Sequence, residues 1–123
     1  MAVLSWDEIR SRAMQFQNEW ANESSENAES KTFWNEFFEI FGVSRRRIAT
    51  FEERVKIEGQ TKFVDLLWKG KLLIEHKSKG KNLDKAYTQA KNYFKGIKDR
   101  DLPQYILVSD FEYFRLYDLD NSE

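Results

Sequence analysis

The spacing of hydrophobic residues changes abruptly after Gly42, and this change limits the possible folds more than any other feature of the chain. Before Gly42, residues 6–22 and the segment that ends at Gly42 carry apolar side chains every three or four positions, which predicts two amphipathic helices. After Gly42, residues 51–57, 62–68 and 71–78 alternate in polarity or form short apolar runs, which predicts three strands. Such a chain is expected to pack helices against a sheet.

The second half of the chain returns once to helical spacing. Residues 82–97 place apolar side chains on one helical face, and residues 104–110 and 111–119 are predicted to be strands. The turns near Gly59 and Gly70 are short, so antiparallel pairing is expected on both sides of them. The order of two helices, three strands, one helix and two strands predicts an α/β fold with a small mixed β-sheet flanked by helices.

The two predicted N-terminal helices supply an aromatic core. The first helix is expected to bury Trp6, Ile9, Ala13, Phe16 and Trp20. The second helix is expected to bury Ala28, Phe33, Trp34, Phe37, Phe38 and Phe41. Ser5 and Glu8 predict a capping box at the start of the first helix, and Gly42 suits the end of the second.

Composition limits the class of protein. The 123 residues, 41% of them hydrophobic, are expected to form one domain spanning residues 1–123. A net charge of −1 argues against a histone-like protein, but local charge still permits nucleic-acid binding. The absence of cysteine excludes disulfides and thiolate metal sites. No apolar stretch is long enough to span a membrane, so a soluble, cytoplasmic domain is expected.

The segment DLLWKGKLLIEHKS carries the residues with a chemical interpretation. Glu75 and Lys77 leave the same face of the third predicted strand, because they are two positions apart. If the hairpin closes near Gly70, Asp65 of the preceding strand lies roughly opposite Glu75. Two carboxylates beside a lysine predict a site for Mg²⁺, for which Mn²⁺ can substitute. Lys77 would position or deprotonate an attacking water.

An E-x-K triplet has little value as a motif by itself, because charged residues at the end of a strand usually face water. The apolar run at residues 72–74 predicts that the strand before Glu75 is buried. Buried carboxylates without a partner are costly, and a metal ion together with a lysine would relieve that cost. The metal site is therefore favoured over a solvated strand end.

Three further residues near the triplet have two interpretations each. His76 is the only histidine, and strand alternation points it away from Glu75 and Lys77, which predicts a packing or surface role. Its backbone carbonyl, between those two residues, is a candidate metal ligand. Gln89 and Tyr93 share a helical face and could orient the site or contact DNA, or they could be a satisfied amide and a core tyrosine.

Basic residues are expected to cluster around the site and to bind DNA phosphates. The alternative is an ordinary solvated face. The basic candidates are Lys69, Lys71, Lys79, Lys81 and Lys85, with the arginine run at 45–47 as an extension.

The stretches TFWNEFFEIFGV, FVDLLWKGKLLIEHKSKGKNLDKAYTQAKNYF and LPQYILVSDFEYFRLYDL resemble the N-terminal nuclease domain of MmeI-like bifunctional restriction–modification enzymes. They are also similar to modules that precede adenine methyltransferases in phage-defence proteins. The resemblance implies the PD-(D/E)xK restriction-endonuclease-like fold, with Asp65, Glu75 and Lys77 as the D…ExK motif. Gln89 and Tyr93 resemble the QxxxY signature of RecB-like nucleases.

The resemblance also implies a Mg²⁺-dependent deoxyribonuclease that acts on double-stranded DNA within a longer chain with methyltransferase and target-recognition domains. A further site acid often comes from the first core helix of this fold, and Glu29 is the candidate there. Glu52, at the start of the first predicted strand, is the competing candidate, and both could equally be ordinary surface or salt-bridge acids. One such site cuts one strand, so cleavage of both strands requires a homodimer or a second complex. Three alternatives stay open: a catalytically silent DNA-binding or scaffolding domain, a RecB-like exonuclease or junction nuclease, and a protein-interaction module with a fortuitous triplet.

Overall fold

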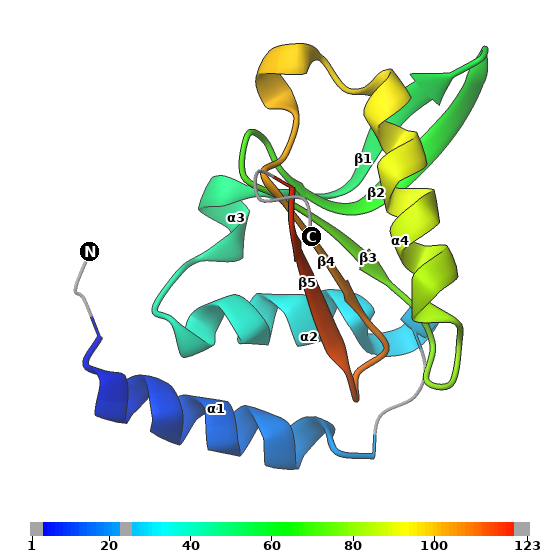
Figure 1. The fold of residues 1–123 in the computed structure, drawn as a ribbon. Helices are drawn as coiled ribbons and strands as arrows, with labels where there is room; N and C mark the ends of the chain where they lie inside the picture. Colours follow the sequence, from blue (N-terminus) through cyan, green and yellow to red (C-terminus); the bar gives the residue numbers. More distant parts are fainter. Residues whose placement is uncertain (1–3, 23–25, 120–123) are drawn as a thin grey trace.

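A sheet between helices forms the body of the molecule (Figure 1). The computed structural model describes residues 4–22 and 26–119. Its elements in chain order are α1 (Trp6–Trp20), α2 (Glu26–Ile40), α3 (Arg45–Ile48), β1 (Thr50–Ile57), β2 (Gln60–Trp68), β3 (Leu72–His76), α4 (Leu83–Asn92), the 3₁₀ turns η1 (Tyr93–Gly96) and η2 (Asp99–Asp101), β4 (Tyr105–Ser109) and β5 (Phe114–Asp118). Within these described residues, no helix is both long and apolar enough to cross a membrane.

The sheet has five strands in the order β1-β2-β3-β4-β5. Strands β1, β2 and β3 form an antiparallel meander, β3 and β4 are parallel, and β4 and β5 are antiparallel. The parallel pair arises because the chain crosses back through α4 between β3 and β4. The predicted α/β class, with a small mixed sheet flanked by helices, is confirmed.

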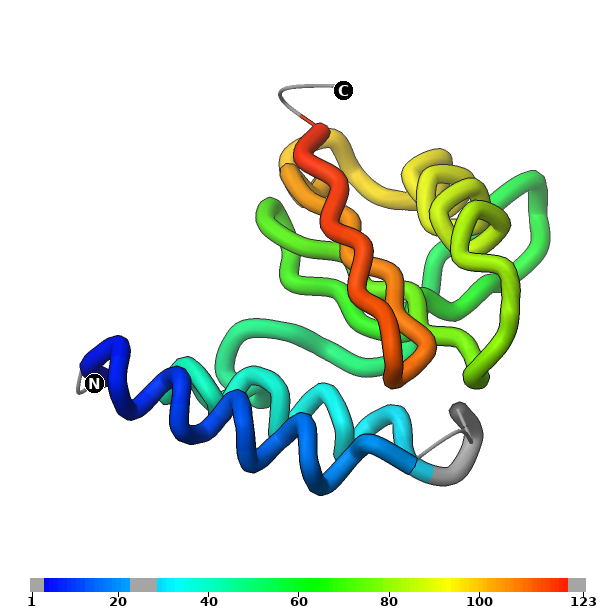
Figure 2. The backbone as a smooth tube through the Cα atoms, turned by 60° about the horizontal axis from the view of Figure 1, so that its bottom comes forward, coloured from blue at the N-terminus to red at the C-terminus, as the bar shows by residue number. Residues whose placement is uncertain are grey.

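Helices cover both faces of the sheet (Figures 1 and 2). On one face, α1 and α2 pack as a pair and contribute an aromatic core. The aromatic side chains buried there are Phe16, Trp20, Phe33, Trp34, Phe38 and Phe111. On the other face, α4 packs on an aliphatic core. The buried residues there include Val55, Val64, Leu67, Leu73, Ala86, Ala90 and Ile106. Alternate residues of the central strands therefore enter different cores.

The helix ends follow the sequence signals. The Ser5 side chain accepts a hydrogen bond from the Glu8 backbone N–H at 3.2 Å, which confirms the predicted N-cap. At the end of α2, Gly42 takes a left-handed φ of 75°, and the Val43 N–H donates to the Phe38 carbonyl at 3.1 Å. This pairing satisfies a free carbonyl of the last turn, so the predicted stop at Gly42 is confirmed.

Two tight turns build the meander. The β1–β2 loop is Glu58 and Gly59, one residue earlier than expected, and both have positive φ, at 52° and 80°. Two left-handed residues form the type I′ turn that matches the twist of an antiparallel hairpin. The β2–β3 loop closes around Gly70, where the sequence predicts it.

Some predicted core residues lie elsewhere. Trp6 is 72% exposed and Phe41 is exposed too. Helical spacing identifies the apolar face of a helix, but it does not say how far a partner covers that face. The side chain of Ala28 lies outside the described part of the chain. The basic run at 45–47 forms most of the short helix α3, which the spacing did not predict.

The predicted helix over residues 82–97 is shorter in the structure, because α4 passes into the 3₁₀ turn η1 at Tyr93. Gly96 at the end of η1 lies close to β1. A Cβ at this position would lie 2.7 Å from the Lys56 carbonyl oxygen, so only glycine permits the approach. This contact holds the end of α4 over the β1–β2 side of the sheet.

Candidate active site

Asp65 and Glu75 meet where β2 and β3 separate. The register between these strands ends at Leu66↔Ile74, and the next residue on each strand is Asp65 or Glu75. Beyond that pair, an Asp65 carboxylate oxygen accepts a hydrogen bond from the His76 backbone N–H at 2.7 Å. The Asp65 side chain therefore accepts a backbone hydrogen bond of β3 at the place where the two strands diverge. The expectation that the two carboxylates lie opposite each other across the hairpin agrees with this geometry.

Lys77 extends the cluster toward α4. Its Nζ lies 3.5 Å from a Glu75 carboxylate oxygen and donates to the Gln89 Oε1 at 2.7 Å. The Gln89 amide nitrogen in turn lies 2.8 Å from the Tyr93 hydroxyl. Lys77, Gln89 and Tyr93 thus form one chain of contacts from β3 to α4. Tyr93 is only 5% exposed, so its expected direct contact with DNA does not fit this buried position, and it supports Gln89 instead.

Burial controls the charge state of the two carboxyl groups. Glu75 is 1% exposed, and burial, followed by the neighbouring charge of Asp65, raises its pKa to about 9. Burial also raises the pKa of Asp65, although the His76 N–H opposes the shift. The 3.5 Å separation from Lys77 has the geometry of an ion pair, yet burial and Asp65 outweigh it. Without a cation, Glu75 is therefore protonated at neutral pH.

The pair fits a hard divalent cation. The Glu75 Oε1 is buried and has no hydrogen-bond partner in the described structure when Glu75 is ionised, whereas a protonated Glu75 shares a side-chain hydrogen bond with Asp65. A cation between the carboxylates would occupy that atom and favour both ionised forms. Mg²⁺ needs only one or two protein carboxylates and takes its remaining ligands from water and phosphate.

The donor set excludes other kinds of metal site. In residues 4–22 and 26–119, no group of three or more His, Cys, Asp or Glu side chains could hold a metal ion. A fully protein-ligated site of the structural zinc type is thus absent there. The His76 carbonyl is a possible additional ligand, because the N–H and C=O of one strand residue point to the same edge, here toward Asp65.

Glu52 lies on β1 opposite Asp65 of β2, between the pairs Phe51↔Leu66 and Glu53↔Val64. Its charge contributes to the raised pKa of Asp65, and its carboxylate lies 3.0 Å from the Lys31 ammonium of α2. Its φ of 52° is left-handed, a conformation that is costly for a residue other than glycine within a strand. No sequence signal indicated this backbone conformation.

Glu29, the competing acid, is half-buried on α2. Of these two candidates, Glu52 is the one whose charge shifts the pKa of Asp65. Within the described residues, however, Glu52, Asp65 and Glu75 do not form a group that could hold a metal ion, so Glu52 and Glu29 both stay candidates for the additional acid.

His76 occupies the opposite face of β3, as strand alternation predicts. It is fully buried, and its Nδ1 accepts a hydrogen bond from the Trp34 indole N–H at 2.9 Å. The ring packs edge-on against Phe33 and Phe111. Burial lowers its pKa to about 4, so the imidazole is neutral. The side chain is a packing group, directed away from Glu75 and Lys77.

The predicted basic cluster is only partly assembled. Lys69 and Lys71 lie in the β2–β3 turn, at the far end of the hairpin from Asp65 and Glu75. Four strand residues separate Lys69 from Asp65, which corresponds to about 13 Å. Lys69 and Lys71 therefore do not surround the site, because the hairpin that brings the carboxylates together holds its own turn away from them.

The other basic candidates divide into two groups. Lys79 and Lys81 lie in the loop after β3, and Lys85 lies in the first turn of α4, so all three remain on the site end of the sheet. In the 45–47 run, Arg45 lies 4.1 Å above the Phe51 ring and donates to Asn35 and to a backbone carbonyl. Arg45 is thus a packing residue of α3 and does not extend the phosphate-binding cluster.

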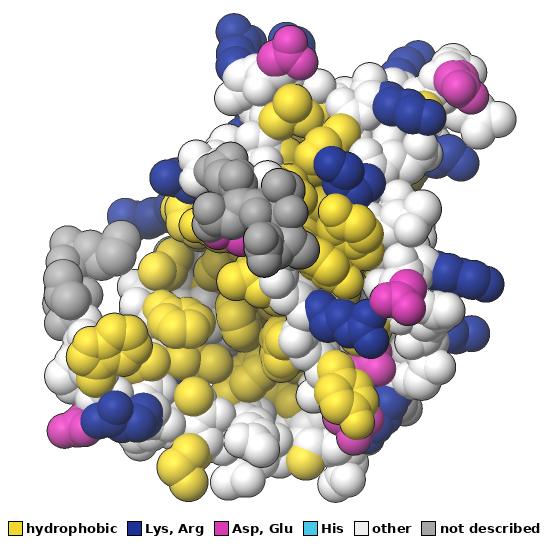
Figure 3. Space-filling view, in the orientation of Figure 1, with side chains coloured by type: hydrophobic (Ala, Val, Ile, Leu, Met, Phe, Trp, Pro, Cys, Tyr) yellow, Lys and Arg dark blue, Asp and Glu magenta, His cyan; other side chains and the backbone are white. Residues whose placement is uncertain are grey.

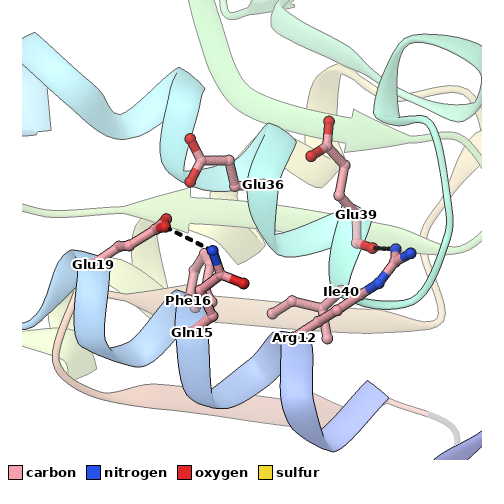
Figure 4. Close-up of a pocket in the computed structure, with 7 residues that line it drawn as sticks. All are labelled: Arg12, Gln15, Phe16, Glu19, Glu36, Glu39 and Ile40. Carbon is pink, nitrogen blue, oxygen red and sulfur yellow. Dashed lines mark hydrogen bonds between the residues drawn. The ribbon is translucent and has the colours of Figure 1, made fainter. Parts of the chain in front are cut away.

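A polar hollow of about 500 Å³ lies between α1 and α2 (Figure 4). Arg12 donates to the Glu39 carbonyl at 2.8 Å, and the Trp20 indole donates to Glu36 at 3.1 Å. These contacts join the two helices. The polar groups of this hollow therefore have a structural use, and it is not a candidate for the chemistry.

An apolar hollow of about 610 Å³ lies between the end of α2 and the sheet strands β2 to β5 (Figure 3). Hydrophobic residues such as Phe37, Trp68 and Leu116 line it, and Lys71 is the only charged residue among the described residues of its lining. It offers no carboxylate, histidine or nucleophile. The junction of β2, β3 and α4 is the better candidate for an active site.

Comparison with known proteins agrees with the sequence motifs. The family described as MmeI, N-terminal domain, matches residues 11–123, which include every residue of the cluster. No curated protein and no solved structure gives a significant match. Because the match covers nearly the whole chain, this protein belongs to the family of MmeI N-terminal domains.

Proposed function

We propose that this chain is a metal-dependent DNA endonuclease domain of a restriction–modification enzyme. The observation that carries the proposal is the Asp65–Glu75 pair, in which a buried Glu75 oxygen has no partner within the described structure while Lys77 lies 3.5 Å from the other. A buried carboxyl group beside a half-buried one, both with raised pKa values, destabilises a fold unless a ligand uses the pair. Membership in the MmeI family supports the restriction–modification context.

Asp65 and Glu75, together with the His76 carbonyl, would hold Mg²⁺, for which Mn²⁺ can substitute. When bound, the ion supplies charge neutralisation at the scissile phosphate and a more acidic water. The His76 N–H keeps the Asp65 carboxylate oriented toward Glu75. Glu52 would accept a proton, or a hydrogen bond from a water molecule, on the side of Asp65 that faces β1.

Lys77 would orient the attacking water and offset negative charge that develops on the phosphate. Gln89 fixes the position of the Lys77 ammonium by accepting one of its hydrogen bonds, and Tyr93 holds Gln89. Three donors on the ammonium leave at least one for the water or phosphate. Gln89 and Tyr93 are thus positioning residues in this scheme.

The family also suggests the larger assembly. We propose that methyltransferase and target-recognition domains of the same chain choose the DNA sequence and that this domain cuts double-stranded DNA. One Asp65–Glu75 site cuts one strand, so a homodimer or a second complex would supply the second cut.

The Lys77–Gln89–Tyr93 chain favours one second candidate, a RecB-like exonuclease or junction nuclease, because that class carries a QxxxY signature. The metal chemistry would be the same and the shape of the substrate would differ. End-labelled linear, circular and branched DNA separate these functions: an endonuclease nicks circles, whereas an exonuclease requires an end.

Plasmid nicking in Mg²⁺ or Mn²⁺ tests the proposal. We expect Lys77→Ala and Asp65→Ala to lower the nicking rate by about 10²–10⁴-fold, the usual loss when a general acid–base group is removed. Lys69→Ala is the matched control, because Lys69 is exposed at the far end of the hairpin, and it should retain the wild-type rate.

Isothermal titration with Mn²⁺ gives an independent readout. Mn²⁺ binding that disappears in Asp65→Ala, with no nicking by the wild type, would favour a nuclease that needs its partner domains over a silent binding module. A folded wild type that neither nicks DNA nor binds Mn²⁺ would overturn the metal site itself.

A further inference from the structure

A groove runs along the solvent side of α4 and its 3₁₀ extension. It has a volume of about 610 Å³ and is lined by Lys85, Thr88, Gln89, Lys91, Asn92 and Lys95. All six lie in the described part of the chain, and none is acidic. A surface hollow whose only charges are three lysines favours a polyanion.

The groove is continuous with the candidate active site. Gln89 lines the groove and also accepts the hydrogen bond from the Lys77 ammonium at 2.7 Å. A ligand that lies in the groove therefore reaches Gln89, the direct partner of Lys77. The β2–β3 turn with Lys69 and Lys71 has no such connection.

The nearest acid on α4 does not compensate this charge. Asp84 pairs with Arg115 of β5 at 2.7 Å, and its backbone carbonyl accepts from the Thr88 hydroxyl at 3.2 Å. The ammonium of Lys91 lies 4.9 Å from the centre of the Phe94 ring, which holds the lysine over an apolar surface. The lysines of the groove thus remain available for an external anion.

The dimensions of the groove suit a nucleic-acid strand. Ten residues separate Lys85 from Lys95, which corresponds to about 15 Å at the rise of an α-helix. One strand of a DNA duplex carries a phosphate for about every 3.4 Å of axis, so about four successive phosphates match this length. Asn92 lies between the lysines and can donate to phosphate oxygens, whereas the Thr88 hydroxyl proton already goes to the Asp84 carbonyl.

We propose that this groove carries the backbone of the double-stranded DNA substrate, with successive phosphates of one strand along α4 between Lys85 and Lys95. The inference rests on the proposed function, because it takes DNA as the substrate of the adjacent site. It goes further by choosing α4 over the β2–β3 turn, and it adds Lys91, Asn92 and Lys95 to the binding surface.

Fluorescence anisotropy with a labelled DNA duplex tests the path of the strand. Binding is measured in EDTA across a series of salt concentrations, so no cleavage occurs. Each lost phosphate contact lowers the slope of log K against log salt by about 0.9, so Lys85→Gln combined with Lys95→Gln should lower it by about 1.8. The affinity near physiological salt should fall roughly tenfold or more.

The matched control combines Lys69→Gln with Lys71→Gln, which removes the same charge from the β2–β3 turn. We expect this control to keep the wild-type slope. An equal loss of slope in the two double variants would show that only net charge matters, and an unchanged slope in the α4 variant would place the strand elsewhere. Either result overturns the inference, as does a wild type that binds no duplex.

Binding and cleavage separate this inference from the proposed function. A wild type that does not nick DNA but shows the α4-dependent slope would leave the groove assignment standing and would reject the nuclease. Normal nicking with no effect of the α4 variant on binding would support the nuclease and reject the groove assignment.

Discussion

The two faces of β3 bury polar groups in different surroundings. Toward α2, His76 is fully buried, and its Nδ1 receives the Trp34 indole N–H while its Nε2 has no hydrogen-bond partner within the described structure. Toward α4, Glu75 is equally buried, and one of its carboxylate oxygens also has no partner there. The aromatic rings around His76 offer no ligand chemistry, whereas Glu75 lies beside a second carboxyl group and a lysine, which is an arrangement that a cation can use.

Burial favours the neutral form on both sides. It lowers the pKa of His76 to about 4 and raises that of Glu75 to about 9. The neutral imidazole can still accept the Trp34 bond at Nδ1, although its Nε2 has no partner within the described structure. The neutral carboxyl beside Asp65 cannot act as a metal ligand until a cation displaces its proton. We therefore expect substitution of His76 to affect mainly stability, and substitution of its neighbour Lys77 to affect mainly activity.

The largest expected contrast is between His76→Ala and Lys77→Ala. Removing the imidazole leaves a cavity and an unpaired Trp34 donor, so the free energy of unfolding should fall by about 2–5 kcal/mol. Lys77→Ala should change it by less than about 1 kcal/mol, because the lysine side chain is partly exposed and its Glu75 partner is protonated without metal. Urea unfolding followed by tryptophan fluorescence measures both. Equal losses in the two variants would contradict the division between the faces.

The next contrast lies in alkaline pH. The folded protein binds the Glu75 proton more tightly than the unfolded chain, because the pKa rises from 4.5 to about 9. The stability associated with that proton is present at low pH and is lost as pH rises toward 9, by up to about 1.4 kcal/mol per pH unit. In EDTA, Glu75→Gln should flatten this slope. Added Mg²⁺ should restore stability to the wild type, since the ion needs the ionised form.

If wild type and Glu75→Gln lost stability in parallel above neutral pH, the carboxyl pair would not be the source of the slope. The same urea titration, repeated at several pH values with and without Mg²⁺, gives this comparison directly.

The smallest contrast lies in acidic pH and has the opposite sign. The pKa of His76 falls from 6.5 to about 4 on folding, so the unfolded chain binds that proton first. Its contribution is present above about pH 6.5 and is lost as pH falls toward 4, again by up to about 1.4 kcal/mol per pH unit. His76→Asn keeps an acceptor near Trp34 and removes the titration. Its unfolding free energy should therefore change less than that of the wild type between about pH 7 and about pH 5. The same change in both proteins would argue against a neutral buried imidazole.

Local patterns were sufficient for much of the fold and for the centre of the site. The period of two in the third strand predicted that Glu75 and Lys77 share a face and that His76 does not. The short turn at Gly70 predicted that Asp65 faces Glu75. Each of these inferences needs only the geometry of one strand or one hairpin, which is why they agree with the structure.

Predictions that depended on distance in space fared differently. Lys69 and Lys71 are close to Glu75 in sequence but lie at the far end of the hairpin, because an extended strand rises about 3.3 Å per residue. Gln89 reaches Lys77 only because α4 packs across β3. The left-handed backbone of Glu52 has no signature in residue type.

The sequence by itself determined the order of the elements, the faces of each strand and the carboxylate pair, since these follow from periodicity and short turns. Only the tertiary structure decided which lysines lie near the pair, that Gln89 contacts Lys77 and that Trp34 donates to the buried His76. Those features depend on packing between segments distant in the chain, such as α4 on β3 and α2 against His76, and periodicity carries no information about such contacts.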